Sequence, residues 1–382
     1  MIKRASFRTN FMLLLFFFLF SFTVGAETTL PEISAEAAIL FDWNSGRILY
    51  AKNPYLARPV ASTTKIMTAV IALEKGKLND KIITSPRAAN TGGSSIWLEE
   101  GEVKNMEELL LGLMLRSGND AAVAIAEHIS GSVEDFAALM TQRAAELGAL
   151  NTSFCNPHGL HHPEHYSTPY DMALISAHAM GIKEFRRIVS TASAVISWPE
   201  QPWDRVLYNQ NKLLTSYEGA EGIKTGWTTP AGRCFVGAAA RDGRRLISVV
   251  LNAPRMWEDT QILLDYGFVE FQHKCFLKKG QHLKSVAVEN GMEDKVKIIA
   301  SQSFGFPLKI PKNNEGSEDN KITYRFVINE PLQAPLKTGE KVGELEISFC
   351  KDVVGRIDLL AGHEVRKISF WEKLKRTFGR RE

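Results

Sequence analysis

The spacing of apolar residues changes along this chain, and each change predicts a different kind of structure. Residues 36–50 alternate around a turn at Asn44-Ser45-Gly46, which predicts a β-hairpin. Helical spacing follows from about residue 63 to residue 190. Strand-like runs return at 222–251, and residues 257–271 predict a closing helix. We therefore expect a first domain whose sheet comes from both ends of this segment, with helices between.

Beyond about His273 the pattern changes to short alternating strands separated by glycine, proline and asparagine. This pattern predicts a small all-β domain over residues 273–364. It contains no catalytic set, and a spacer and a partner-docking module are both open interpretations. Lys337-Thr338-Gly339 lies there between polar flanks and is interpreted as a solvated turn.

The N-terminal segment differs from both domains. Three basic residues precede a mostly apolar run at 11–24, and Val24-Gly25-Ala26 is a small-residue cleavage pattern. These features predict a secretory signal peptide over residues 1–26, with an uncleaved anchor as the alternative. We accordingly expect an exported protein, at the outer face of the cytoplasmic membrane or in the periplasmic or cell-wall space.

The C-terminal residues 365–382 combine an apolar stripe with basic faces. Ile368, Trp371, Leu374 and Phe378 recur at helical steps, and lysines and arginines cover the other faces. A basic amphipathic helix that carries a tryptophan is suited to lie in a membrane interface. This segment is therefore predicted to be a membrane-anchor helix, with a solvated tail or a helix packed on its own domain as alternatives.

Charge and cysteine content narrow the classes of function. Residues 1–26 contain three basic groups and no acids, so their removal leaves 43 basic and 43 acidic residues. Nucleic-acid binding needs excess positive charge, and no nucleic-acid partner is expected. Cys155, Cys234, Cys275 and Cys350 show neither zinc-type spacing nor a scaffold pattern, and one or two disulfides stay open.

The candidate chemistry begins at Ser62-Thr63-Thr64-Lys65. Residues three apart share one face of a helix, so the Lys65 amine can lie beside the Ser62 hydroxyl. A serine hydroxyl is a poor nucleophile until a base takes its proton. The pattern alone is weak evidence, because a capping serine followed by a surface lysine has the same spacing.

Two further motifs follow in chain order. Ser117-Gly118-Asn119 lies between two apolar helical runs, where a polar triplet is costly to bury without a purpose. Lys224-Thr225-Gly226 precedes a predicted hairpin with a turn at Asp242-Gly243. The order S-x-x-K, S-x-N, K-T-G matches a known catalytic set of serine acyl-transfer enzymes.

With these motifs the chain resembles the low-molecular-weight penicillin-binding proteins, which are serine-type D-alanyl-D-alanine carboxypeptidases. The resemblance covers residues 30–365 and includes the Gly-rich segment 90–102 and Asn156-Pro157-His158-Gly159-Leu160. It implies an α/β (α+β) penicillin-binding/β-lactamase-like transpeptidase domain at 27–272, with an antiparallel sheet and a helical cluster, followed by the all-β domain. It also implies a peptidoglycan pentapeptide substrate, inhibition by β-lactams, no cofactor and no metal.

The resemblance implies a role for each motif residue. Ser62 would be the nucleophile, Lys65 its base and Ser117 a proton relay. The substrate-binding set would be Asn119, Lys224, Thr225, Gly226 and Trp227. The backbone N–H groups of Ser62 and Trp227 would form the oxyanion hole. Lys65 can act as a base only when neutral, and burial and the nearby Lys224 charge are expected to lower its pKa.

Departures and rival functions complete the sequence evidence. Gln210 stands where some relatives place an arginine, which leaves that contact to the substrate carboxylate in doubt. The string at 146–151 has one residue too many for the E-x-x-L-N motif of class A β-lactamases. Residues 161–165 fit H-x-x-E-H, but Gly159 and nearby prolines predict a loop with a surface histidine cluster there instead of a metallopeptidase helix. A D,D-endopeptidase acting on crosslinks and a non-catalytic wall-binding scaffold are the alternatives.

Overall fold

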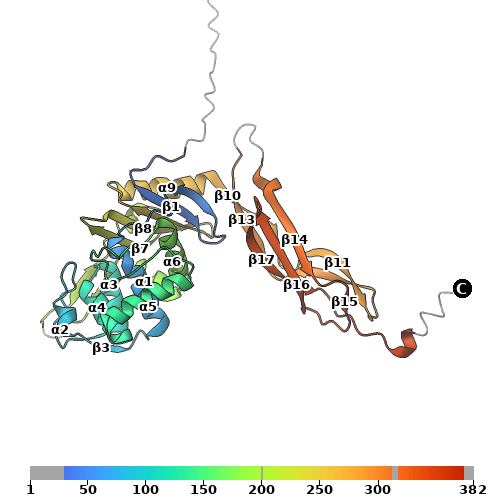
Figure 1. Ribbon diagram of the computed structural model, residues 1–382, viewed down its shortest axis with the longest axis horizontal. Helices are drawn as coiled ribbons and strands as arrows, with labels where there is room; N and C mark the ends of the chain where they lie inside the picture. The colour runs from blue at the N-terminus through green and yellow to red at the C-terminus, as the bar shows by residue number, and fades with distance from the viewer. Residues whose placement is uncertain (1–29, 199–200, 312–316, 374–382) are drawn as a thin grey trace, which may run out of the picture. The chain divides into compact units, whose positions relative to one another are not determined.

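The computed structural model describes residues 30–198, 201–311 and 317–373 (Figure 1). The first domain contains a five-stranded antiparallel sheet with the strand order β2-β1-β9-β8-β7. Its strands are β1 (Ala37–Asp42), β2 (Ile48–Lys52), β7 (Ala220–Thr228), β8 (Gly232–Arg241) and β9 (Arg244–Leu251). Because β1 pairs with β9, the sheet joins the two ends of the domain, as the sequence pattern predicted.

Helices cover both faces of this sheet. One face packs against a cluster made of α1 (Lys65–Lys75), α3 (Met106–Leu115), α4 (Asn119–Ser130), α5 (Val133–Glu146), α6 (Pro169–Gly181) and α7 (Lys183–Val189), and the other against α9 (Met256–Glu270) (Figure 1). Ile39 and Phe41 belong to the core on the cluster side, and Ala38 and Leu40 to the core on the α9 side. Successive side chains of a strand point to opposite faces of the sheet, so β1 contributes to both hydrophobic cores.

Helix α1 lies at the centre of the cluster. Its residues Lys65 to Ala72 are all buried, so the helix has no solvent-facing side over this stretch. A helix that is buried all round is normally apolar all round, and a lysine at its first position is therefore unusual. The position of Lys65 needs polar partners from neighbouring segments.

Short elements complete the first domain. They are α2 (Pro86–Ala89), α8 (Leu213–Ser216) and two antiparallel strand pairs, β3 (Lys81–Ile83) with β4 (Val103–Asn105) and β5 (Ser193–Ile196) with β6 (Arg205–Tyr208). A buried ion cluster joins the two strand pairs, and in it Glu102 contacts both Lys104 and Arg205. Arg205 also donates a hydrogen bond to the carbonyl oxygen of Trp97 at 2.6 Å.

The C-terminal domain is built from strands, as predicted. They are β10 (Phe271–Leu277), β11 (His282–Glu289), β12 (Lys295–Ala300), β13 (Phe304–Lys309), β14 (Ile322–Ile328), β15 (Leu332–Gln333), β16 (Lys341–Phe349) and β17 (Asp352–Ala361). Six of them form a sheet in the order β14-β16-β17-β12-β11-β15, and β10 pairs with β13. β10 begins at Phe271, slightly before the predicted start of this domain at residue 273.

The second K-T-G lies in this domain. Thr338 and Gly339 form an exposed turn, and Gly339 has a φ of +80°. The interpretation of Lys337-Thr338-Gly339 as a solvated turn is confirmed. All four cysteines are free thiols, which answers the question of disulfides that the sequence left open.

The predicted C-terminal helix begins later than residue 365. Lys367 bridges to Gly291, and the Ile368 N–H donates to the carbonyl oxygen of Asn290. The chain turns helical only at Phe370, so the inclusion of Ile368 in the helix was wrong. Backbone hydrogen bonds to the β domain hold this stretch extended.

The side chains that begin this helix are open to solvent. Phe370 and Trp371 are 72% and 71% exposed. The rest of the stripe, in residues 374–382, and the predicted signal peptide at 1–26 lie outside the described residues. Within the described ranges no helix combines the length and the apolarity that a bilayer crossing requires.

Candidate active site

The segment that carries Ser62 is a short 3-10 helix, Ala61–Thr64, which leads into α1 at Lys65. Thr63 Oγ1 donates to the carbonyl oxygen of Val60, and Thr64 Oγ1 donates to that of Ala61. The start of α1 has no side-chain cap, so Ser62 is not used as a capping residue. Its hydroxyl is available to the lysine one turn later.

Lys65 meets three oxygen atoms. Its Nζ lies 3.1 Å from Ser62 Oγ, 2.7 Å from Asn119 Oδ1 and 2.7 Å from the carbonyl oxygen of His158. The side chain is fully buried. These partners satisfy the polar group that α1 buries. They also join α1 to the N-terminus of α4 and to the loop that contains His158.

The charge state of Lys65 follows from its surroundings. Burial holds the pKa of Lys65 well below its usual value, the Lys224 charge lowers it further, and the Asp120 carboxylate opposes both. Burial also lowers the pKa of Lys224 to about 7. Burial is the main reason that the pKa of the neighbouring His158 falls to about 3. The surroundings thus favour a neutral amine at Lys65.

Ser117 and Asn119 stand at the sharp connection between α3 and α4. Ser117 has a φ of +64°, a left-handed conformation that is strained for a residue with a Cβ. Asn119 Nδ2 donates to the carbonyl oxygen of Gly92 at 2.7 Å. A Cβ on Gly93 would lie 2.6 Å from Asn119 Nδ2, so the Gly-rich segment fits closely around this amide.

Asp120 holds the rest of the Gly-rich segment. Its buried carboxylate accepts hydrogen bonds from Ser95 Oγ and from the backbone N–H groups of Ile96 and Leu98. These bonds fix the chain beside Ser94, whose side chain lines the cleft. Sequence reasoning did not single out Asp120 or Ser94. An acid directly after S-x-N, in the first turn of a helix, is the signal that was present for Asp120.

The K-T-G motif lies on β7, the edge strand beside the helix start. Lys224 is buried and donates from Nζ to the carbonyl oxygen of Thr225 at 3.0 Å. A Cβ on Gly226 would lie 2.9 Å from the Ser62 nitrogen, so glycine allows the strand to approach the nucleophile this closely. Trp227, the next residue, is 65% exposed at the rim of the site.

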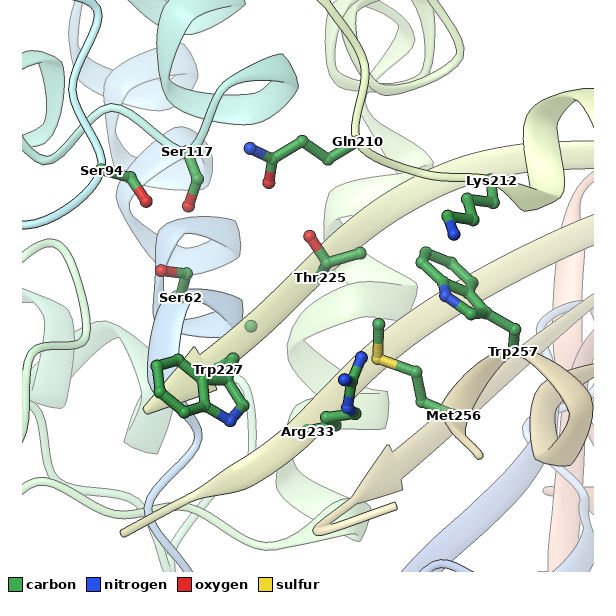
Figure 2. Close-up of a pocket in the computed structure, with 11 residues that line it drawn as sticks. Ser62, Ser94, Ser117, Gln210, Lys212, Thr225, Trp227, Arg233, Met256 and Trp257 are labelled. Carbon is green, nitrogen blue, oxygen red and sulfur yellow. The ribbon is translucent and has the colours of Figure 1, made fainter. Parts of the chain in front are cut away.

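The predicted site residues come together around two adjoining clefts that share Ser62. The first has a volume of about 330 Å³, and its lining includes Ser62, Ser94, Ser117, Gln210, Lys212, Thr225, Trp227, Arg233, Met256 and Trp257 (Figure 2). The serine hydroxyls gather at one end, and Lys212, Met256 and Trp257 stand at the other (Figure 2). The second cleft, of about 440 Å³, contains Asn119, Leu160 and Trp227.

The H-x-x-E-H segment is a loop, as predicted, but the prediction of a surface cluster was wrong for His165, which is buried and has a structural role. The ring is buried, its Nδ1 accepts the Cys155 N–H at 3.1 Å, and its Nε2 lies 2.8 Å from Thr64 Oγ1. Burial lowers the pKa of His165 to about 4, so the ring is neutral. The accepting Nδ1 fixes the proton on Nε2, which donates to Thr64.

Together these features define a class of protein. An antiparallel sheet and a helical cluster bring a serine–lysine pair, an S-x-N turn and a K-T-G strand into one cleft, as expected of a serine acyl-transfer enzyme. The family model for D-alanyl-D-alanine carboxypeptidase, peptidase S11, matches residues 24–255. That for the C-terminal domain of penicillin-binding protein 5 matches residues 271–367. The chain belongs to the D-alanyl-D-alanine carboxypeptidase family of low-molecular-weight penicillin-binding proteins.

Individual relatives match over nearly the whole chain. The D-alanyl-D-alanine carboxypeptidase DacF of Bacillus subtilis is 34% identical over 93% of this chain and 92% of its own length. The crystal structure of penicillin-binding protein 5 from Haemophilus influenzae has a TM-score of 0.73 at 30% identity, covering 89% of this chain and all of that one. A peptidoglycan synthesis regulatory factor, PBP3, from Streptococcus pneumoniae has a TM-score of 0.76 at 26% identity, covering 88% and 100%.

Proposed function

We propose that this protein is a serine-type D-alanyl-D-alanine carboxypeptidase. It removes the terminal D-alanine from the pentapeptide stems of peptidoglycan through an acyl-enzyme on Ser62, and β-lactams acylate the same serine. The observation that carries the proposal is the fully buried Lys65 amine, 3.1 Å from Ser62 Oγ. Family membership supports the reaction and the substrate.

Acylation begins with proton transfer from the serine. A neutral lysine amine has two N–H groups and one lone pair. Asn119 Oδ1 and the His158 carbonyl oxygen accept the two hydrogens, which leaves the lone pair for the Ser62 hydroxyl proton. Ser62 Oγ then attacks the carbonyl carbon of the terminal peptide bond.

The tetrahedral intermediate needs an oxyanion site and a proton for the leaving group. The backbone N–H groups of Ser62 and Trp227 supply the oxyanion site, and the close approach at Gly226 supports this pairing. Ser117 donates its hydroxyl proton to the leaving nitrogen and recovers one from the Lys65 ammonium, so D-alanine departs and Lys65 returns to neutral. Water, deprotonated by Lys65, then hydrolyses the ester.

The position of the substrate's terminal carboxylate indicates which part of the substrate each cleft would bind. Thr225 donates a hydroxyl hydrogen bond to this carboxylate, and Lys224 adds charge behind it. The carboxylate belongs to the residue that leaves, so the first cleft, which contains Thr225, is the leaving-group half. The second cleft, beyond Ser62, takes the peptide stem, and Asn119 orients it there.

Two measurements test the proposed function. The purified protein is incubated with a peptide ending in D-Ala-D-Ala, and released D-alanine is quantified with and without a chelator. We expect release that survives the chelator and is lost in Ser62→Ala. Fluorescent penicillin should label the protein at Ser62, and a wild-type protein that is folded but neither labels nor releases D-alanine would favour the scaffold alternative.

The two lysines of the K-T-G motifs supply a matched pair of variants. Lys224→Ala is expected to raise KM for the same peptide, because charge at the carboxylate is lost. Lys337→Ala changes the exposed turn of the β domain and is expected to leave the kinetics unchanged. Equal effects of the two substitutions would contradict the assignment of the carboxylate site to β7.

We also propose that residues 1–26 are removed on export and that the C-terminal segment lies on the outer face of the cytoplasmic membrane. The exposed Phe370 and Trp371, with basic residues nearby, support an interfacial contact. N-terminal sequencing of the exported protein should begin at Glu27. Co-sedimentation with vesicles containing phosphatidylglycerol should be lost when the chain ends at residue 369, and undiminished binding would refute the anchor.

A further inference from the structure

Among the described residues, the leaving-group half of the cleft is lined by two exposed cationic side chains and by no acidic one. Arg233 projects from β8, Lys212 precedes α8, and both line the cleft with Thr225 (Figure 2). In the part of the chain that the structure describes, neither side chain makes a hydrogen bond or ion pair, and no Asp or Glu lines this cleft. Most arginines of the catalytic domain, by contrast, are ion-paired.

Unpaired charges that converge on an open cleft favour an anionic ligand. The field of two cations and no acid attracts negative charge and disfavours a cationic or neutral group in the same place. Arg233 stands opposite Trp227 in the pairing of β7 with β8, and the sheet therefore fixes its backbone. A rigid scaffold beneath a charged side chain is what a recognition site requires.

Lys224 of the K-T-G motif supplies only part of the positive charge that a bound carboxylate needs. Lys224 is buried, its ammonium is already bound to the Thr225 carbonyl oxygen, and its pKa is about 7. Gln210, on the same cleft, is neutral. A permanent positive charge on the same cleft as Thr225 is the Arg233 guanidinium, whose planar donors match a carboxylate. One cationic partner is enough for the terminal carboxylate of the substrate. The Lys212 ammonium is therefore available to bind a second anionic group.

We propose that this half of the cleft, besides taking the D-alanine of the proposed reaction, is a subsite for a leaving D-amino acid with two carboxylates. Arg233 and Thr225 bind the terminal carboxylate, and Lys212 binds an acid on the side chain of the same residue. Met256 and Trp257 line the space between them and suit the methylene groups of such a side chain. The inference rests on the proposed function and names a substrate class for the same site.

Leaving-residue chemistry can be varied while everything else is held constant. Three peptides are made that differ only in their last residue, which is D-Ala, D-Gln or D-Glu, and kcat/KM is measured from the released amino acid. D-Gln has nearly the shape of D-Glu without its charge. We expect the wild-type protein to prefer D-Glu over D-Gln by about 5-fold, which is the scale of one partly exposed charge pair. Raising the ionic strength should shrink this ratio.

Substitutions then assign the charge to a residue. Lys212→Met should bring the D-Glu to D-Gln ratio to about 1, and Arg233→Gln should raise KM for all three peptides. Lys77→Met serves as the matched control, because Lys77 is an exposed lysine away from the cleft, and it should leave the ratio as in the wild type.

The outcomes separate this inference from the proposed function. The wild-type protein could release D-Ala and yet cleave the D-Glu and D-Gln peptides equally, or prefer D-Gln. That result overturns the proposed subsite and does not contradict the proposed carboxypeptidase activity. A preference for D-Glu that survives Lys212→Met also overturns it. Failure to release any of the three residues overturns both.

Discussion

Gly226→Ala tests whether the close approach of β7 to the nucleophile matters for catalysis. The added Cβ would lie 2.9 Å from the Ser62 nitrogen, 3.1 Å from the Thr63 nitrogen and 3.2 Å from Ala61 Cβ. Ordinary contacts for such an atom begin at 3.4 Å, so β7 and the 3-10 helix must move apart by a few tenths of an ångström. The two N–H groups proposed for the oxyanion site, those of Ser62 and Trp227, belong to these two segments.

The expected loss follows from the chemistry of that site. Removing an oxyanion donor costs about 10²–10³ in rate, and misplacement by ~1 Å costs about 10². A shift of a few tenths of an ångström should therefore lower the acylation rate by about 10- to 100-fold. The cost in folding free energy should be about 1–3 kcal/mol, which is typical of overpacking.

Stopped-flow acylation by a fluorescent penicillin measures the rate, and thermal unfolding measures the stability. Gly181→Ala is the matched control, because a Cβ at Gly181 meets no atom within 4 Å. It should leave the acylation rate unchanged. An acylation rate of Gly226→Ala within 3-fold of the wild type, with the protein folded, would refute the role given to the close approach.

Four further predictions concern three buried polar residues. The Lys224 ammonium is lost as pH rises through about 7, so kcat/KM should fall there, and Lys224→Arg should move that fall to higher pH in a pH–rate profile. Burial lowers the pKa of Lys224 in the folded protein below its unfolded value of 10.5. Between pH 7 and 10.5 the unfolded chain therefore binds the proton more strongly, and the free energy of unfolding should rise with pH. Denaturant titrations of Lys224→Met should not show this rise. Ser117→Gly should relieve about 1 kcal/mol of left-handed strain, raising the Tm while acylation slows. Glu102→Gln leaves Lys104 and Arg205 facing each other without an anion and should cost about 3–5 kcal/mol in urea unfolding.

The sequence predicted the fold class and the residues that meet at the site, because both depend on local patterns. The S-x-x-K spacing brings Lys65 beside Ser62 through the geometry of one helical turn. Both causes of the lowered pKa of Lys65, its burial and the Lys224 charge, were expected, and burial is the larger of the two. Gly93 and Gly226 were recognised as parts of motifs. Their close contacts could not be predicted, because they are made with segments that are distant in the sequence.

Other parts of the site have no local signature. The His158 carbonyl oxygen binds Lys65 through the backbone, and any residue there has a carbonyl group. Arg233 and Lys212 look like ordinary charged residues in a strand and a loop until the sheet brings them to one cleft. The late start of the C-terminal helix was missed for a similar reason, since the Ile368 amide finds its partner in a distant turn.

The strand order has a consequence for the order in which the enzyme acquires activity. β9 is the last strand of the sheet to be synthesised, yet it lies between β1 and β8. A nascent chain that ends before Arg244 therefore has its serine and lysine but lacks the strand that joins the β1–β2 hairpin to the β7–β8 hairpin. An incomplete polypeptide has no assembled cleft, and the protein cannot be acylated efficiently until its catalytic domain is almost entirely made.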